Sequence, residues 1–290
     1  MNVSKQITRI VILIAALLVF SVNNSPVMKA EDLSNYTLDL PGVVEEIASG
    51  ADILITEDPS AANITEKDSD NMHLNFVSGG SNHTHQYIIA SAISILNHDK
   101  GNSVLNTYGT SLLYYTDWPD DHETDTGTFA RHFYDPDTGK NWLGQSSPTA
   151  KTRAVQYYNN AVEEYRMGNI EEAFIHLGKG THFVSDINVP HHASNLTALN
   201  SNHVEFEKYI DKNRLNYKVA GNTLAEKTYL EAVNTEVADL IQNTAVYAKS
   251  LANSAQQSSY YNEVGNKIVP RAITNNVQYI YKFCKEVRIF

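Results

Sequence analysis

The sequence predicts an all-α domain, and three features indicate this fold class. Apolar residues recur at helical spacing over most of the chain from residue 84 onward, and the strict alternation typical of strands is scarce there. One cysteine among 290 residues excludes a disulfide scaffold and a zinc site built from several cysteines. A composition of 42% hydrophobic and 19% charged residues is sufficient to bury a core.

The expected helices follow one another with few interruptions. The run His85–Leu96 (HQYIIASAISIL) predicts the first helix. A turn-rich stretch over 116–143, dense in Asp, Gly, Pro and Thr, separates it from a second helix that includes Ala154 and Tyr165 and ends at Gly168. Further helices are expected over 170–186, 223–255 and 265–286.

The net charge of −11 is unevenly distributed along the chain. Residues 1–30 carry three bases and no acid around the eleven-residue apolar run Ile10–Phe20, which is too short to span a bilayer and typical of a secretory signal peptide. Residues 31–72 hold eleven acids and one base, which indicates an acidic pro-segment or linker, or else a solvated surface helix around 43–55. The acidic balance argues against binding to duplex nucleic acid.

Histidines gather in the middle of the chain, and none lies in the last 87 residues. His182 and Asp186 are four residues apart, so their side chains project from one helix face. His203 and Glu207 repeat this spacing, and His192 lies between the two pairs. Such pairs on facing helices are how helical bundles build di-metal sites. Ligands limited to His, Asp and Glu suit zinc, manganese or iron, and the lack of redox motifs favours hydrolytic zinc.

Four stretches carry a resemblance to a known family. The stretch His182–Asn195 (HFVSDINVPHHASN) resembles the signature of bacterial zinc-dependent phospholipases C. The stretches 132–140 (HFYDPDTGK), 84–99 (THQYIIASAISILNHD) and 203–207 (HVEFE) resemble further parts of this family in the same order. Together they cover most of residues 84–210, so the resemblance identifies residues 73–290 as a phospholipase C-like catalytic domain.

The resemblance implies three zinc ions in one cleft of an α-helical domain. The implied ligands are His132, His182 and Asp186 for the first ion, His192, His203 and Glu207 for the second, and His85 with a bridge from Asp186 for the third. In the family, a tryptophan at the mature N-terminus also ligates the third zinc, but Met72–Phe76 stand in its place here. The mature chain therefore starts at His73 or Phe76, another residue such as His83 replaces the tryptophan, or only two zinc ions bind.

The resemblance also implies a catalytic acid and a substrate-binding pair. Asp117 falls where the family has the carboxylate that orients or deprotonates the attacking water, with Asp120 and Asp121 close by in sequence. Trp118 and Phe129 match aromatic positions that cup a choline head group, which suits the attraction of a cation to ring faces. Packing around the turn is the alternative role for both rings.

The expected function is that of a secreted zinc-dependent phospholipase C. It would hydrolyse the glycerol-side phosphodiester bond of phospholipids such as phosphatidylcholine, at a membrane or micelle surface and with a metal-activated water. It is expected to be a monomer without a transmembrane segment after signal removal and without a nucleic-acid partner. The alternatives are a zinc-dependent single-strand nuclease or nucleotidase and a catalytically degenerate zinc protein.

Overall fold

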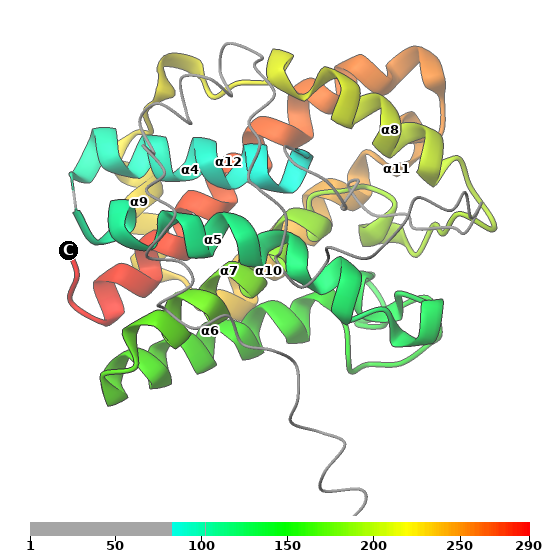
Figure 1. The fold of residues 1–290 in the computed structure, drawn as a ribbon. Helices are drawn as coiled ribbons and strands as arrows, with labels where there is room; N and C mark the ends of the chain where they lie inside the picture. The colour runs from blue at the N-terminus through cyan, green and yellow to red at the C-terminus, as the bar shows by residue number, and fades with distance from the viewer. Residues whose placement is uncertain (1–82, 102) are drawn as a thin grey trace, which may run out of the picture. The chain divides into compact units, whose positions relative to one another are not determined.

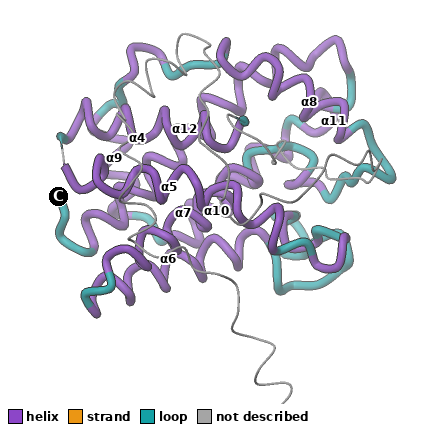
Figure 2. The backbone as a smooth tube through the Cα atoms, in the orientation of Figure 1, coloured by secondary structure: helices purple, strands orange, loops and turns teal. Residues whose placement is uncertain are grey.

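The structure, a computed structural model, describes residues 83–101 and 103–290, and it confirms the all-α prediction. Within these residues the chain forms helices and loops, and the only β-type pairing is an isolated bridge between Asp135 and Lys140 (Figure 2). The α-helices are α4 (Thr84–Lys100), α5 (Ser103–His122), α6 (Ala150–Met167), α7 (Ile170–Ile187), α8 (His203–Asn213), α9 (Glu226–Asn234), α10 (Val237–Ser250), α11 (Ala252–Ala255) and α12 (Tyr261–Glu286).

Helix α7 is the central element of the packing. It contacts α4, α5, α6, α10 and α12, and Figure 1 shows it in the middle of the described helices. Phe174, Leu177, Phe183 and Ile187 of α7 are fully buried, because neighbours cover this helix on nearly every side. A side chain placed near the C-terminal end of α7 is therefore held in the interior of the domain.

The ends of α6 follow the signals in the sequence. Thr149 and Thr152 form a capping box at its start, in which each backbone N–H donates to the other residue's hydroxyl, at 2.8 and 3.2 Å. Gly168 ends the helix with a φ of 87°, which glycine adopts without steric cost. The prediction that this helix stops at Gly168 is confirmed.

Helix α4 begins at a carboxylate that α8 supplies. Asp211 accepts hydrogen bonds from the Thr84 backbone N–H at 3.0 Å and from the Thr84 hydroxyl at 2.7 Å, and it lies 3.4 Å from Nδ1 of His83. A negative group at a helix N-terminus satisfies unpaired N–H groups and complements the helix dipole. This contact holds His85, in the first turn of α4, next to α8.

Two boundaries differ from the sequence predictions. The predicted turn-rich stretch over 116–143 is wrong at its start, because α5 continues through Pro119 to His122. The Glu123 N–H donates to the Pro119 carbonyl at 2.7 Å, so the helical pattern resumes after the proline. The single helix predicted over 223–255 is also wrong: Thr235 and Glu236 are extended and Leu251 separates α10 from α11.

None of the described helices is long and apolar enough to cross a membrane.

Candidate metal centre

The structure brings all seven predicted ligands into the interior of the domain, where each is at most 1% exposed. They come from the first turn of α4, the short helix Ala130–His132, the C-terminal half of α7, the short helix His192–Ser194 and the start of α8. Together with Asp120 of α5 they form three groups able to hold a cation: His85, Asp120 and His182; His132, His182 and Asp186; His192, His203 and Glu207.

Asp186 belongs to the second group and also faces His85 of the first group. Its Oδ2 is 2.9 Å from Nδ1 of His132 and 3.2 Å from Nε2 of His182. Its Oδ1 is 3.6 Å from Nε2 of His85, on the other side of the carboxylate. Asp186 can therefore act as a bridge between two cation positions, as the resemblance implies, because its two oxygens face different histidines.

Backbone carbonyls fix the orientation of three of the imidazole rings. Nδ1 of His182 lies 2.7 Å from the Thr116 carbonyl, and Nδ1 of His192 lies 2.8 Å from the His132 carbonyl. Nε2 of His132 lies 3.2 Å from the Glu123 carbonyl. Since a carbonyl only accepts, each of these nitrogens carries the proton when the ring is neutral, and the other nitrogen of each ring turns a lone pair toward the carboxylates.

This donor set fits zinc. Nε2 of His182 and Nδ1 of His132, the two nitrogens left with lone pairs, are only 3.0 Å apart, a distance that needs a positive charge between or on them. Oδ1 of Asp186 and Oε2 of Glu207 are buried without a hydrogen-bond partner, which is costly unless a cation occupies the site. Imidazole nitrogens with one carboxylate are a common ligand set for zinc.

The third group lies on α8 and the short helix before it. Oε1 of Glu207 is 2.8 Å from Nε2 of His203 and 3.2 Å from Nε2 of His192. The i, i+4 spacing on α8 places His203 and Glu207 on one face of that helix, as the sequence predicts. Phe133 stacks on the His192 ring at a centroid distance of 4.6 Å and so limits its rotation.

The charges of the site shift the pKa values of its members in opposite directions. Burial alone would lower the pKa of His182, but the carboxylates of Asp186 and Asp120 raise it well above the ordinary value. Burial alone would raise the pKa of Glu207, but His203 and His192 lower it to about 2. The carboxylates are thus ionised at neutral pH, which is the form that binds a metal.

Asp120 is the site residue that the sequence suggested only as a neighbour of Asp117. Its Oδ1 lies 3.3 Å from Nε2 of His182 and 3.5 Å from Nδ1 of His132, and the residue is 5% exposed. Asp117 lies about one turn earlier on α5, outside the three ligand groups, with its Oδ1 buried and unpartnered. Asp117 and Asp120 are three residues apart, a spacing that places both side chains on one face of a helix. Because the sequence predicts a turn here, this spacing could not be used to predict the position of Asp120.

The two aromatic residues with a predicted role in substrate binding lie in different surroundings. Nζ of Lys179 lies 3.6 Å from the ring centroid of Trp118, and the His122 ring stacks on Trp118 at 4.2 Å. Phe129 is 8% exposed, and its ring contacts the His132 ring at a centroid distance of 5.7 Å. Of the two, only Phe129 contacts a predicted metal ligand, while Trp118 already holds a cation of the chain itself.

The two predicted replacements for the missing tryptophan differ in what the structure says of them. His83 lies 3.4 Å from Asp211 and is in none of the three groups. The stretch Met72–Phe76, with His73 and Phe76 as possible mature N-termini, lies outside the described residues.

The described residues thus form an all-α protein with three groups of histidines and carboxylates that could each hold a metal ion. The family model described as zinc dependent phospholipase C matches residues 84–264, and the chain belongs to this family. A phospholipase C of Paraclostridium bifermentans is 29% identical in an alignment of 234 residues that covers 70% of this chain and 59% of that relative. A phospholipase C of Bacillus cereus is 34% identical in an alignment of 179 residues that covers 57% of this chain and 61% of that relative.

A solved structure supports the same relationship. The alpha toxin of Clostridium absonum superimposes with a TM-score of 0.65 at 25% identity, over 70% of this chain and 63% of that chain. The chain thus spans about three fifths of the length of these three relatives. The family match over residues 84–264 includes all of the ligand residues from His85 to Glu207.

Proposed function

We propose that this protein is a secreted phospholipase C that binds three zinc ions and acts on phospholipids such as phosphatidylcholine. The observation that carries the proposal is the convergence of eight buried histidines and carboxylates, the seven predicted ligands and Asp120, in three groups able to hold a cation, in a chain of the zinc-dependent phospholipase C family. The bond cleaved is the phosphodiester bond on the glycerol side, and the products are diacylglycerol and a phosphorylated head group. The protein acts as a monomer at a membrane or micelle surface.

The zinc ligands are the three sets that the resemblance implies, and Asp120 joins His85 at the ion to which Asp186 bridges. Bound zinc supplies charge neutralisation at the phosphoryl oxygens and lowers the pKa of a water molecule. Asp120, ionised because His182 lowers its pKa against the effect of burial, can accept the proton of an attacking water at Oδ1. The carbonyls of Thr116 and Glu123 keep His182 and His132 in the tautomers that binding requires.

Substrate comparison tests the proposal directly. The purified zinc-loaded protein should release a phosphorylated head group from phosphatidylcholine micelles, and removal of zinc by a chelator should abolish this release. Zinc added back should restore it. Faster cleavage of single-stranded DNA than of phosphatidylcholine would favour the nuclease alternative, and no turnover of either substrate by the zinc-loaded protein would favour a degenerate zinc protein.

A pair of matched substitutions separates the two candidate catalytic carboxylates. We expect Asp120→Asn to reduce kcat for phosphatidylcholine by about 100-fold or more, because it removes the proposed proton acceptor beside His182. Asp117→Asn should lower kcat less, because Asp117 lies outside the ligand groups. Zinc content, measured for both variants, separates a lost ligand from a lost base. A larger effect of Asp117→Asn at full zinc content would return the base role to Asp117.

Binding of a choline head group by Trp118 would require Lys179 to move. If Trp118 binds the head group, Lys179→Met should lower KM for phosphatidylcholine by roughly 2- to 30-fold, the range of a cation–π contact. Lys151→Met is the matched control, because Lys151 lies over a different ring, that of Tyr134, at 5.3 Å. An unchanged KM in Lys179→Met would mean that Trp118 serves packing, and the role in head-group binding would rest on Phe129 alone.

We also propose that residues 1–30 are a signal peptide, that residues 31–72 are an acidic pro-segment, and that residues 73–290 are the catalytic domain. The support is the sequence pattern, since residues 1–82 lie outside the described part of the chain. Sequencing the N-terminus of the exported protein tests these boundaries. We further propose that the acidic segment keeps the enzyme inactive by denying the third zinc the free amine of the mature N-terminus. A full-length form as active as the trimmed form would contradict this inhibitory role.

A further inference from the structure

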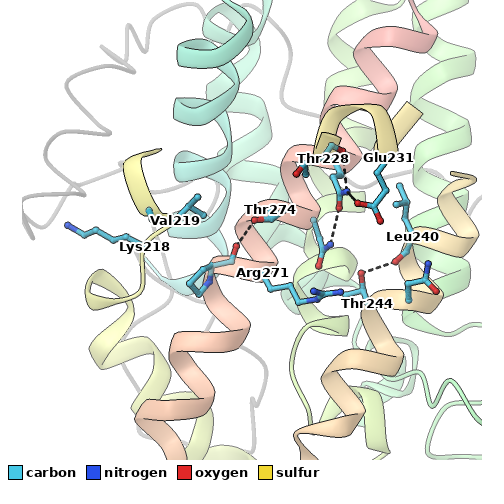
Figure 3. A pocket seen from close by; sticks show the side chains of 13 residues that line it. Lys218, Val219, Thr228, Glu231, Leu240, Thr244, Arg271 and Thr274 are labelled. Carbon is cyan, nitrogen blue, oxygen red and sulfur yellow. Dashed lines mark hydrogen bonds between the residues drawn. The ribbon is translucent and has the colours of Figure 1, made fainter. Parts of the chain in front are cut away.

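A cavity of about 380 Å³ opens between α9, α10 and α12, and none of its lining residues belongs to the metal centre. Figure 3 shows that its lining side chains come from these three helices and from the segment around Val219 that precedes α9. Since a water molecule takes up about 30 Å³ of liquid, the cavity has room for an organic molecule of roughly ten non-hydrogen atoms. It is therefore large enough for a ligand of its own.

The wall that α12 contributes is polar, although it faces other helices. Arg271, Asn275 and Gln278 follow one another at spacings of four and three residues, so they form one stripe along α12. Helix faces turned toward other helices normally carry apolar side chains, as the opposite face of α12 does with Val269, Ile273 and similar residues. These three polar side chains form one wall of the cavity.

Arg271 brings a positive charge to this cavity without a partner charge. Its Nε is buried without a hydrogen-bond partner, and no carboxylate of the described residues lies within ion-pair distance of its guanidinium. The guanidinium carbon lies 4.0 Å from the ring centroid of Tyr247, which fixes its plane. Figure 3 shows the Arg271 side chain reaching toward Thr244, while Lys218 points away from it.

Neighbouring groups add hydrogen-bond acceptors at a second point of the cavity. Oδ1 of Asn275 is buried and unpartnered, while its Nδ2 donates to Oε1 of Gln278 at 3.1 Å. Nε2 of Gln278 in turn donates to Oε2 of Glu231 at 3.3 Å, which leaves the other oxygen of this exposed carboxylate open to a ligand. The cavity thus combines an anion-binding guanidinium with acceptors for hydroxyl or amine groups.

We propose that this cavity is a second ligand site, for a small molecule that carries one oxyanion, a phosphate or a carboxylate, together with hydroxyl groups. Arg271 binds the oxyanion through its fork of N–H donors. Asn275 accepts a hydrogen bond from a hydroxyl of the same molecule. The site is separate from the metal centre, because it shares no residue with the ligand groups.

Calorimetric titration of the zinc-loaded protein tests this site with three probes of equal backbone: sn-glycerol 3-phosphate, glycerate and glycerol. We expect one site per chain for at least one of the two anionic probes, and no measurable binding of uncharged glycerol. The ratio of the affinities for sn-glycerol 3-phosphate and glycerate shows whether the site prefers a phosphate or a carboxylate. Binding of glycerol as tight as that of both anions would contradict an anion site.

Two variants assign the site to the cavity and separate it from anion binding by zinc. Arg271→Met and Asn275→Asp should each lower the affinity for the anionic probe by about tenfold or more. Asn275→Asp does so by placing a carboxylate one helical turn from the guanidinium of Arg271. Arg166→Met is the matched control, because Arg166 is an exposed arginine on α6 paired with Glu286. Affinity unchanged in both cavity variants would overturn the proposal, and binding that disappears only on zinc removal would assign the anion to the metal centre.

Discussion

An Asp186→Asn substitution is expected to lower the zinc affinity of the protein more than about 100-fold and to abolish its hydrolysis of phosphatidylcholine. Asp186 contacts His132, His182 and His85 through its two oxygens, so under the proposed function it would serve two cation positions at once. The amide has the same shape but carries no charge, and its NH₂ group would face an imidazole where an oxygen accepts in the native chain. Zinc content by atomic spectroscopy and a competitive chelator titration measure the loss.

Asp137→Asn is the matched control for this substitution. Asp137 has a side chain that is 72% exposed and pairs with Lys249 at the surface, so its replacement should leave zinc content and turnover nearly unchanged. Full zinc content in Asp186→Asn would show that this carboxylate is not a ligand. Loss of a single zinc with retained turnover would mean that the third position is dispensable for the reaction.

The pairs of ligands within one helix could be predicted from the sequence because their geometry is local. Spacing of four residues places His182 above Asp186, and His203 above Glu207, in any regular helix. Both pairs are in hydrogen-bond or ion-pair contact in the structure. Neither pair on its own indicates how the two helices meet, and it was the resemblance to a family that connected them with His85 and His132.

The position of Asp120 could not be predicted because it depends on a helix that continues past a proline. A proline in a stretch rich in Asp, Gly and Thr indicates a turn, and in a turn the spacing of Asp117 and Asp120 carries no information. In the structure α5 keeps its helical form through Pro119 and delivers Asp120 to His182. The contact of Lys179 with Trp118 is likewise an inter-helix contact, between α7 and α5, which no local pattern contains.

The helical spacing of apolar residues also failed to predict the break between two short helices. Residues 223–255 keep helical spacing, but α9 and α10 are separate helices joined by the extended residues Thr235 and Glu236. The bend lets Tyr229 of α9 and Ile241 of α10 both reach the core. Both helices also line the cavity beside Arg271.

Close approach of α5 to α7 links the packing of the domain to the geometry of the metal centre. Gly178 of α7 lies against Leu112 and Tyr115 of α5, and a Cβ atom at this position would be 2.9 Å from the Cβ of Tyr115 and 3.2 Å from the Leu112 carbonyl oxygen. Immediately beyond this crossing, the Thr116 carbonyl orients His182 and Asp120 faces it. The distance between the two helices therefore sets the position of Asp120 relative to the α7 ligands.

Gly178→Ala is accordingly expected to destabilise the protein and to reduce its turnover together. A glycine-to-alanine change within a helix normally stabilises by about 0.5–1 kcal/mol, but here the added methyl group meets backbone and Cβ atoms that cannot rotate away. We expect a net loss of about 2 kcal/mol, or a fall in Tm of about 4–8 °C, by thermal unfolding. A displaced α5 lengthens the 3.3 Å contact of Asp120 with His182, so kcat for phosphatidylcholine should fall as well.

Gly180→Ala distinguishes this effect on the site from a loss of stability alone. A Cβ atom at Gly180 would collide with the hydroxyl of Tyr279 on α12, which donates to the Ala154 carbonyl at 2.7 Å, and it would leave α5 untouched. This variant should unfold at a lower temperature, as Gly178→Ala does, but keep its kcat and zinc content in the folded state. Equal kcat losses in the two variants would mean that the α5–α7 distance does not control Asp120. A Gly178→Ala protein more stable than the native chain would mean that α5 moves away at no cost.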